Sequence, residues 1–122
     1  MAILDRLTSI FSRGGRDDNR LQQGMQHADA KRPTQAIAIY DNLLNSKGTS
    51  PTVRAKALFN RALAYSSLKE DQKAIADLEA LVVLPGTPEN VLSAARNQLV
   101  RVRNRVQRSQ DRSQSHAKAP VH

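Results

Sequence analysis

The sequence contains no cysteine and no tryptophan, and it is poor in aromatic residues. The absence of cysteine excludes a disulfide framework, thiol catalysis and a thiolate metal site. The four aromatic residues are Phe11, Tyr40, Phe59 and Tyr65, and alanine is abundant, a composition that favours closely packed helices over sheet. We therefore expect an all-α fold. Because nothing indicates an oxidising compartment, we also expect a cytoplasmic location.

The chain also lacks a long apolar run, since a membrane-spanning helix needs about 20 consecutive apolar residues. Asp5 and Arg6 interrupt the apolar start of the chain, which has no preceding basic region, so a secretion signal is not expected either. With 122 residues, of which 39% are hydrophobic, the sequence has enough apolar side chains for one modest core plus tails.

Positive charge is the main compositional excess. The chain carries 19 Lys and Arg against 11 Asp and Glu, a net charge of +8, of which +3 arises up to Pro88 and +5 from Glu89 onward. A basic C-terminal quarter attracts polyanions such as nucleic acid, anionic lipid or an acidic protein surface. The sign of the charge does not choose among them.

Proline, glycine and polar loops divide the chain into segments with helical spacing of apolar residues, and no strand is needed. The predicted helices span 17–31, 34–46, 52–68, 71–83 and 88–108. Residues 109–122 are too polar to bury a face, which predicts a disordered basic tail.

An amphipathic segment, residues 1–15, ends in the Ser-Arg-Gly-Gly stretch at residues 12–15, which predicts a break before the next helix. One helical face of this segment is apolar, formed by Ile3, Leu4, Leu7, Ile10 and Phe11. Two interpretations stay open for this face. It folds back onto an open end of the other helices, or it lies on a membrane surface or in a partner's groove.

An internal repeat links two parts of the chain, residues 20–48 and 58–86. Small residues match small residues, and large apolar residues match large apolar residues, at an offset of 38 positions. The pairs are Gly24 with Ala62, Ala36 with Ala74, Tyr40 with Leu78, Leu43 with Leu81, and Gly48 with Gly86. Each unit reads as two antiparallel helices with small residues where their backbones approach.

The repeat resembles the tetratricopeptide (TPR) repeat. In the second unit the family's places are filled by Leu58, Ala62, Tyr65, Ala74, Leu78 and the Pro85-Gly86 turn, with Arg61 where leucine is usual. In the first unit Gly24, Ala36, Tyr40 and Leu43 fit, while Arg20 and Gln23 stand at positions that are usually apolar. The resemblance implies an α-α superhelix with repeats over about 17–50 and 55–88.

The segment 89–108 looks like the capping helix that covers the last TPR repeat. It carries one apolar stripe, formed by Val91, Ala95, Leu99, Val102 and Val106. Arg96 stands where a further repeat would need a small residue, so the helical domain is expected to span 17–108. Because a solenoid usually needs three or more repeats, two alternatives stay open for the exposed stack ends: self-association of the chain, or a partner that completes the stack.

The TPR resemblance implies that this is a non-catalytic scaffold or adaptor that binds a peptide or a helix of a partner protein. In the family the first helix of each pair lines a concave groove. By register the groove-lining residues here are Asp18, Leu21, Met25, Lys56, Phe59, Asn60, Leu63, Asn97 and Arg101.

A second hypothesis is that of an accessory protein associated with nucleic acid or a membrane surface, acting through its arginines or its amphipathic start. The residues at helical spacing for contact with a polyanion are Arg101, Arg105, Arg108 and Arg112. No aromatic residue accompanies them for base stacking.

Catalytic and cofactor motifs are not found in the sequence. His27, His116 and His122 share no metal-ligand spacing, and no phosphate-binding glycine loop occurs. The acidic pairs Asp17-Asp18 and Glu70-Asp71 are interpreted as favourable charges at helix N-termini. We therefore expect neither an enzyme nor a bound metal or cofactor.

Overall fold

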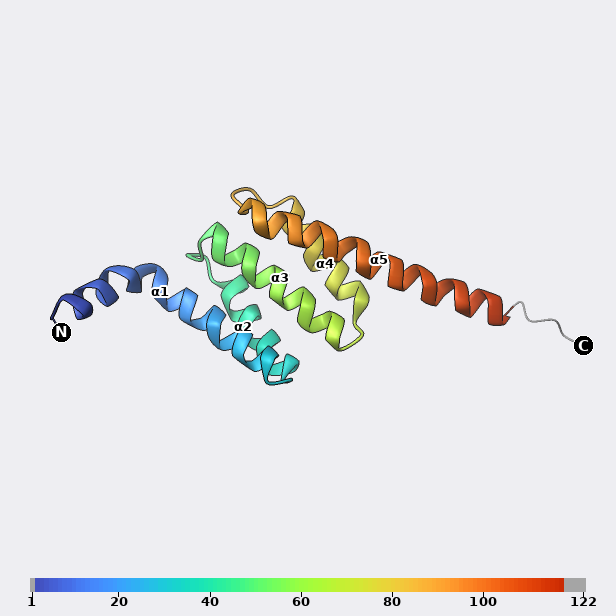
Figure 1. Ribbon diagram of the computed structural model, residues 1–122, viewed down its shortest axis with the longest axis horizontal. Coiled ribbons are helices and arrows are strands. Elements are labelled where there is room, and N and C mark those ends of the chain that lie inside the picture. Colours follow the sequence, from blue (N-terminus) through green and yellow to red (C-terminus); the bar gives the residue numbers. More distant parts are fainter. Residues whose placement is uncertain (1, 118–122) are drawn as a thin grey trace, which may run out of the picture.

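The computed structural model describes the backbone of residues 2–117 and the side chains of residues 15–115, and it shows an array of α-helices (Figure 1). The helices are α1 (Ala2–Asp29), α2 (Pro33–Asn45), α3 (Pro51–Ser67), α4 (Asp71–Val82) and α5 (Glu89–Ala117). Between residues 2 and 117 no strand occurs, so the all-α prediction is confirmed. The bounds of α2, α3 and α4 differ from the predicted segments by at most one residue.

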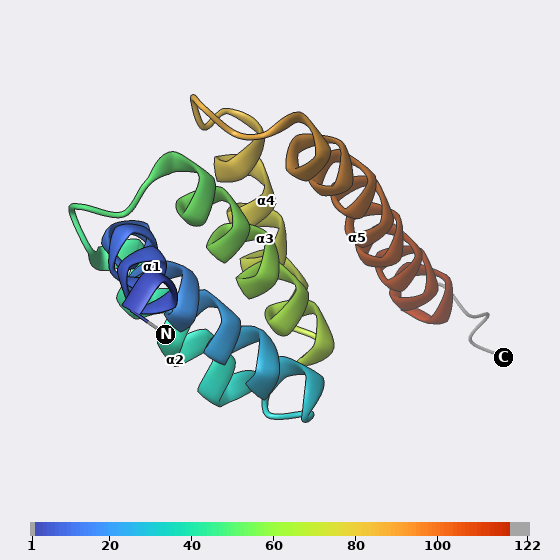
Figure 2. The same ribbon diagram turned by 60° about the vertical axis from the view of Figure 1, so that its left-hand side comes forward.

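Helix α3 occupies the centre of the molecule and packs against each of the other four helices. Helices α1 and α5 flank α3 on one side of the array, whereas α2 and α4 pack behind them, and the described backbones of α2 and α4 do not approach each other closely (Figure 2). The core is accordingly in two parts. One lies between α1, α2 and α3, and the other lies between α3, α4 and α5.

Small residues allow the helices of each pair to approach closely, as the repeat predicts. A Cβ atom placed on Gly24 of α1 would lie 2.4 Å from a ring carbon of Tyr40 on α2, which no real side chain tolerates. Tyr40, Ala36, Ala62 and the equivalent small residue Ala74 of α4 are fully buried. Glycine at position 24 therefore leaves the space that the Tyr40 ring fills.

The turns within the two helix pairs have the same backbone geometry. Lys31 after α1 and Lys69 after α3 both adopt left-handed conformations, with φ angles of 62° and 60°. The amide of the residue after each lysine donates to the carbonyl five residues back, at 2.8 Å in the first turn and 2.9 Å in the second. This is the Schellman pattern of helix termination, and the 38-residue repeat thus extends to the hydrogen bonds of the turns.

Helix α1 continues through the glycine pair at which the sequence analysis places a break, and that prediction is wrong. A glycine ends a helix when it adopts a left-handed conformation after the last turn, and Gly15 is helical instead. Figure 1 shows that α1 bends in its N-terminal part, a deformation that glycine permits. Asp17 and Asp18 therefore lie within a helix and not at its start. The predicted apolar face of residues 1–15 lies outside the described side chains.

Helix α5 extends to Ala117, well beyond the predicted end at residue 108. The prediction of a disordered tail is therefore wrong for residues 109–117, and residues 118–122 lie outside the described part. The side chains of residues 107–115 are all exposed. Because no proline or glycine interrupts this stretch and Gln107 donates to Asp111 at 3.0 Å one turn later, local interactions suffice to continue the helix without packing.

Candidate binding groove

A groove runs between α1 and α3 and consists of two adjoining hollows, which we call the α1–α3 groove. The first hollow has a volume of about 520 Å³ and is lined by Asp18, Leu21, Gln22, Met25, Lys56, Phe59 and Asn60. The second, of about 500 Å³, is lined by Met25, Ala28, Asp29, Lys31, Pro33, Asn60, Leu63, Ala64 and Ser67. Met25 and Asn60 line both hollows, so the two form one continuous depression.

Apolar side chains form the middle of the α1–α3 groove. Leu21 and Met25 are four residues apart on α1, and Phe59 and Leu63 are four residues apart on α3, so each pair lies on one side of its helix. Leu21 is buried, whereas Met25 is 40% exposed and Leu63 is 37% exposed. The groove therefore presents two large apolar side chains to solvent.

Charged side chains stand toward the ends of the groove. Asp18 and Lys56 line the first hollow, and Asp29 and Lys31 line the second. Each hollow thus has one acidic and one basic side chain, so the groove is close to neutral although the chain carries +8. The side-chain amide of Asn60 donates to the carbonyl of Lys56 at 2.8 Å, which leaves its oxygen as an acceptor.

Seven of the nine residues predicted to line a groove do line these hollows. The exceptions are Asn97 and Arg101, which are exposed on α5 and line neither hollow. Helices α1 and α3 lie beside each other, as the TPR resemblance implies. The position of α5 depends on how its own stripe docks, with Ala95 and Val102 fully buried.

The arginines predicted to contact a polyanion differ in their surroundings. Arg105 binds the carboxylate of Asp71 through two nitrogens, at 3.1 and 2.6 Å, and also donates to the hydroxyl of Ser66. The hydrogen bonds to Asp71 raise the pKa of the Arg105 guanidinium. Arg101, Arg108 and Arg112 are exposed, and they form no ion pair with another described side chain.

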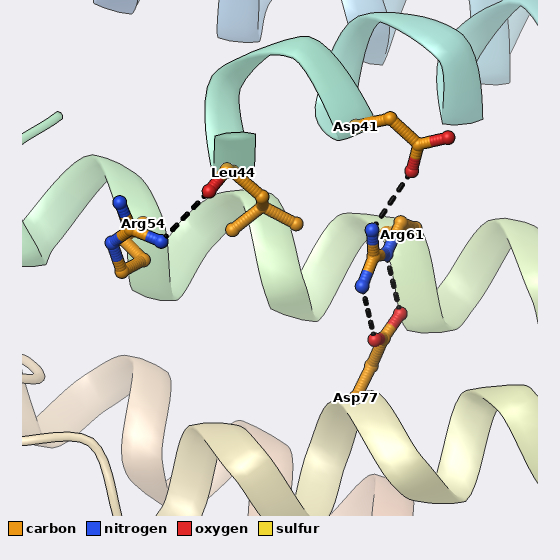
Figure 3. Close-up of polar contacts among 5 residues, drawn as sticks. All are labelled: Asp41, Leu44, Arg54, Arg61 and Asp77. Carbon is orange, nitrogen blue, oxygen red and sulfur yellow. Dashed lines mark hydrogen bonds and ion pairs between the residues drawn. The ribbon is translucent and has the colours of Figure 1, made fainter. Parts of the chain in front are cut away.

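Arg61 is a structural residue whose contacts were not predicted from the sequence (Figure 3). Its guanidinium binds both carboxylate oxygens of Asp77 on α4, at 2.8 and 2.6 Å, and one oxygen of Asp41 on α2, at 2.8 Å. Hydrogen bonding to Asp77 raises the pKa of Arg61 above its ordinary value. The only sequence signal was that Arg61 departs from the TPR pattern the chain resembles, because its partners are 16 and 20 residues away.

A second arginine, Arg54, closes the end of α2. Its guanidinium donates to the main-chain carbonyls of Leu44 and Ser46, both at 3.0 Å, and the contact with Leu44 is drawn in Figure 3. These carbonyls lack partners within their own helix. Arg54 and Arg61 both lie on α3, and both bind groups at or near α2, so they join the second helix pair to the first.

Groups that suit metal binding are not found in the described part of the chain, where no cluster of three or more His, Asp or Glu side chains forms. His27 is half-buried on α1, away from other histidines in the sequence. Within residues 2–117, no helix combines the length and the apolar character that crossing a bilayer requires. The described side chains interact through packing, hydrogen bonds and charge.

Comparisons of this chain with protein-family models, with curated proteins and with solved structures found no match.

Proposed function

We propose that this chain is a non-catalytic interaction module that holds a short segment of a partner protein in the α1–α3 groove. The arrangement of helices supports a TPR-like array: α1 and α5 both pack on α3, and the two helix pairs repeat in their turns and in their small buried residues. In such an array the first helices of successive pairs form the binding side.

The observation that carries this proposal is the exposure of Met25 and Leu63 within one groove. Met25 comes from α1 and Leu63 from α3, and both line the same hollow. Large apolar side chains that gather in a depression mark contact sites for other molecules. Methionine suits this role because its flexible thioether adapts to different partners.

The occupant that fits this groove is a peptide segment with two or three apolar side chains and little net charge. The apolar side chains would contact Met25, Phe59 and Leu63, and the oxygen of Asn60 can accept a hydrogen bond from the peptide. Asp18 with Lys56, and Asp29 with Lys31, provide one charge of each sign at either end. Because these charges cancel, recognition depends on apolar burial and not on a charged ligand.

The test is selection of binding peptides from a random display library, followed by affinity measurements on variants. Met25→Gln with Leu63→Gln removes the apolar contacts and keeps two good helix formers at exposed positions. We expect the selected peptides to lose about tenfold or more in affinity, since two buried apolar contacts are worth more than about 1.4 kcal/mol.

The matched control is Val83→Gln with Val100→Gln, which changes two exposed apolar residues outside the groove, 77% and 57% exposed. This variant is expected to bind the same peptides with unchanged affinity. Equal affinity of the groove variant and the control variant would contradict the proposal, as would a selection in which no peptide is enriched.

A further inference from the structure

The second half of α5 leaves the helical array and carries a concentrated positive charge. Val102 is the last fully buried residue of α5, and Arg105 fastens the helix to Asp71 and Ser66, beside the turn between α3 and α4. Figure 1 shows α5 continuing past the other helices. Residues 101–115 hold five arginines and one acidic residue, Asp111.

The arginines at positions 101, 105, 108 and 112 follow a spacing of four, three and four residues, which places them along one side of the helix. We call them the arginine face. At about 1.5 Å per residue the face is about 16 Å long. Arg105 is engaged with Asp71, so Arg101, Arg108 and Arg112 are the members with exposed guanidinium groups and no recorded ion pair in the described part of the chain.

Lysines at the helix-pair turns add charge to the same end of the molecule. Lys69 lies two residues before Asp71, the partner of Arg105, and Lys31 holds the equivalent place in the other turn. Figure 2 shows both turns at the end from which α5 departs. Both lysines adopt left-handed backbone conformations, which cost a non-glycine residue about 1 kcal/mol each. Positive side chains occupy positions where the backbone favours glycine.

The chemistry of this surface fits a polyanion that presents phosphate groups. Arginine forks bind phosphate oxygens, like carboxylate oxygens, with two hydrogen bonds. Residues 89–117 contain no phenylalanine, tyrosine or tryptophan, which disfavours the base stacking on which single-strand binding depends. Between residues 103 and 117 Val106 is the only large apolar side chain, so this part of the helix lacks the apolar face with which a helix enters a membrane surface.

We infer that the arginine face of α5 binds the phosphate backbone of a nucleic-acid duplex without reading its sequence. A duplex carries about one charge per 1.7 Å of axis, so about nine phosphates fall within the length of the face. Contacts to phosphate position a protein but carry no base information. None of the four arginines of the face lines the α1–α3 groove, whereas Lys31 lines its second hollow. Binding by the arginine face therefore does not depend on binding in the groove.

The experiment is fluorescence anisotropy with two labelled duplexes of about 20 base pairs and unrelated sequence, at several salt concentrations between about 50 and 200 mM. The test variant is Arg101→Gln with Arg108→Gln and Arg112→Gln, which keeps Arg105 as the anchor. The control variant is Arg16→Gln with Lys47→Gln and Arg96→Gln, which removes the same charge from exposed positions outside the face.

Both duplexes are expected to bind the unmodified chain with similar affinity. In the test variant the slope of log K against log salt should fall by about 2 to 3, close to 0.9 for each lost contact, and the affinity should fall by about tenfold or more at low salt. The control variant should keep its affinity within about threefold. Met25→Gln with Leu63→Gln should bind the duplex as the unmodified chain does.

Three results would overturn the inference. The first is an equal loss in the test and control variants, because binding would then follow net charge alone. The second is tighter binding to vesicles of anionic lipid than to the duplex, or to single strands than to the duplex. The third is the absence of duplex binding at the lowest salt concentration. Circular dichroism of each variant distinguishes loss of contact from loss of the helix.

Discussion

At the scale of single residues, the most consequential side chain is Arg61, which lies between α2 and α4 and joins both to α3. Its partner Asp77 is almost fully buried, with a side chain 7% exposed, whereas Asp41 is 45% exposed. Removing one partner of a buried ion pair leaves an uncompensated charge, which costs more than the pair itself contributes. The two carboxylates therefore differ in importance although both contact the same guanidinium.

We expect Arg61→Met to lower the free energy of unfolding by about 2 to 4 kcal/mol, because Asp77 is left buried without its counter-ion. Asp41→Asn should cost less than about 1 kcal/mol, since Asp41 is well solvated. The double variant Arg61→Met with Asp77→Leu should recover most of the loss. Urea denaturation measures all three. A double variant as unstable as Arg61→Met alone would contradict this explanation.

Tyr40 is fully buried, and its hydroxyl has no hydrogen-bond partner among the described residues. Burial, assisted by the charge of Asp29, raises the pKa of Tyr40 to about 12. A raised pKa means that the folded chain holds the phenolic proton more tightly than the unfolded chain does. The contribution to stability is therefore complete below about pH 10 and is lost as the pH rises toward 12.

We expect Tyr40→Phe to remove this loss, which amounts to about 2 kcal/mol at pH 12. At pH 7 the variant should be more stable than the unmodified chain by about 1 kcal/mol, because no polar group is buried without a partner. Denaturation curves of both proteins at pH 7, 10 and about 11.5 provide the comparison. Parallel pH profiles for the two proteins would show that Tyr40 is not the responsible group.

At the scale of elements, the turns that follow α1 and α3 are built alike, and each keeps a lysine in a left-handed conformation. Glycine is the residue that this position favours, because it has no Cβ to clash with the carbonyl oxygen that follows. The turn geometry recurs because the hydrogen bonds that end both helices recur at the repeat offset. Local backbone strain is thus present twice in the array.

We expect Lys69→Gly to raise the free energy of unfolding by about 0.5 to 1 kcal/mol, through relief of this strain. The same substitution at Lys73, inside α4, should lower it by about 1 kcal/mol, because glycine is unfavourable within a helix. Thermal unfolding of the two variants measures the difference. Destabilisation by Lys69→Gly would show that the lysine side chain contributes more than the backbone strain costs.

The element bounds show which sequence signals are sufficient. Two signals predicted the bounds of α2, α3 and α4 to within one residue. They are the proline at the first position of α2 and of α3, and the polar loops between the helices. The break predicted at the glycine pair and the disorder predicted after residue 108 were both wrong. At both places the outcome depends on the local balance between helical and non-helical backbone conformations. Gly15 keeps a helical conformation, and the end of α5 continues without burying a face.

At the scale of the whole molecule, the repeat predicted which side of the array would be hollow. Seven residues that line the hollows were named from the TPR resemblance, which implies that the first helix of each pair faces a groove, and helical spacing then decides which side chains share that face. The contacts of Arg61, and the exclusion of Asn97 from the groove, were not predictable in the same way, because they depend on the packing of helices distant in sequence. The internal repeat therefore predicts the arrangement of the helices but not the ion pairs between them.

The two proposed sites of the molecule differ in electrostatics, which predicts different responses to salt. Peptide binding in the near-neutral α1–α3 groove should change by less than about twofold between about 50 and 200 mM salt, because no net charge is neutralised. Duplex binding by the arginine face should weaken steeply over the same range. Isothermal titration of a selected peptide at both salt concentrations checks the first statement. A steep salt dependence would assign peptide binding to the basic surface.

The central claim, that the α1–α3 groove holds a partner segment, is tested most directly by methyl NMR of the complex between this chain and a selected peptide. We predict nuclear Overhauser contacts from the peptide to the methyl group of Met25 and to those of Leu63. The methyl groups of Val83 and Val100 should remain unaffected. Contacts to Val83 or Val100 without contacts to Met25 and Leu63 would contradict the claim.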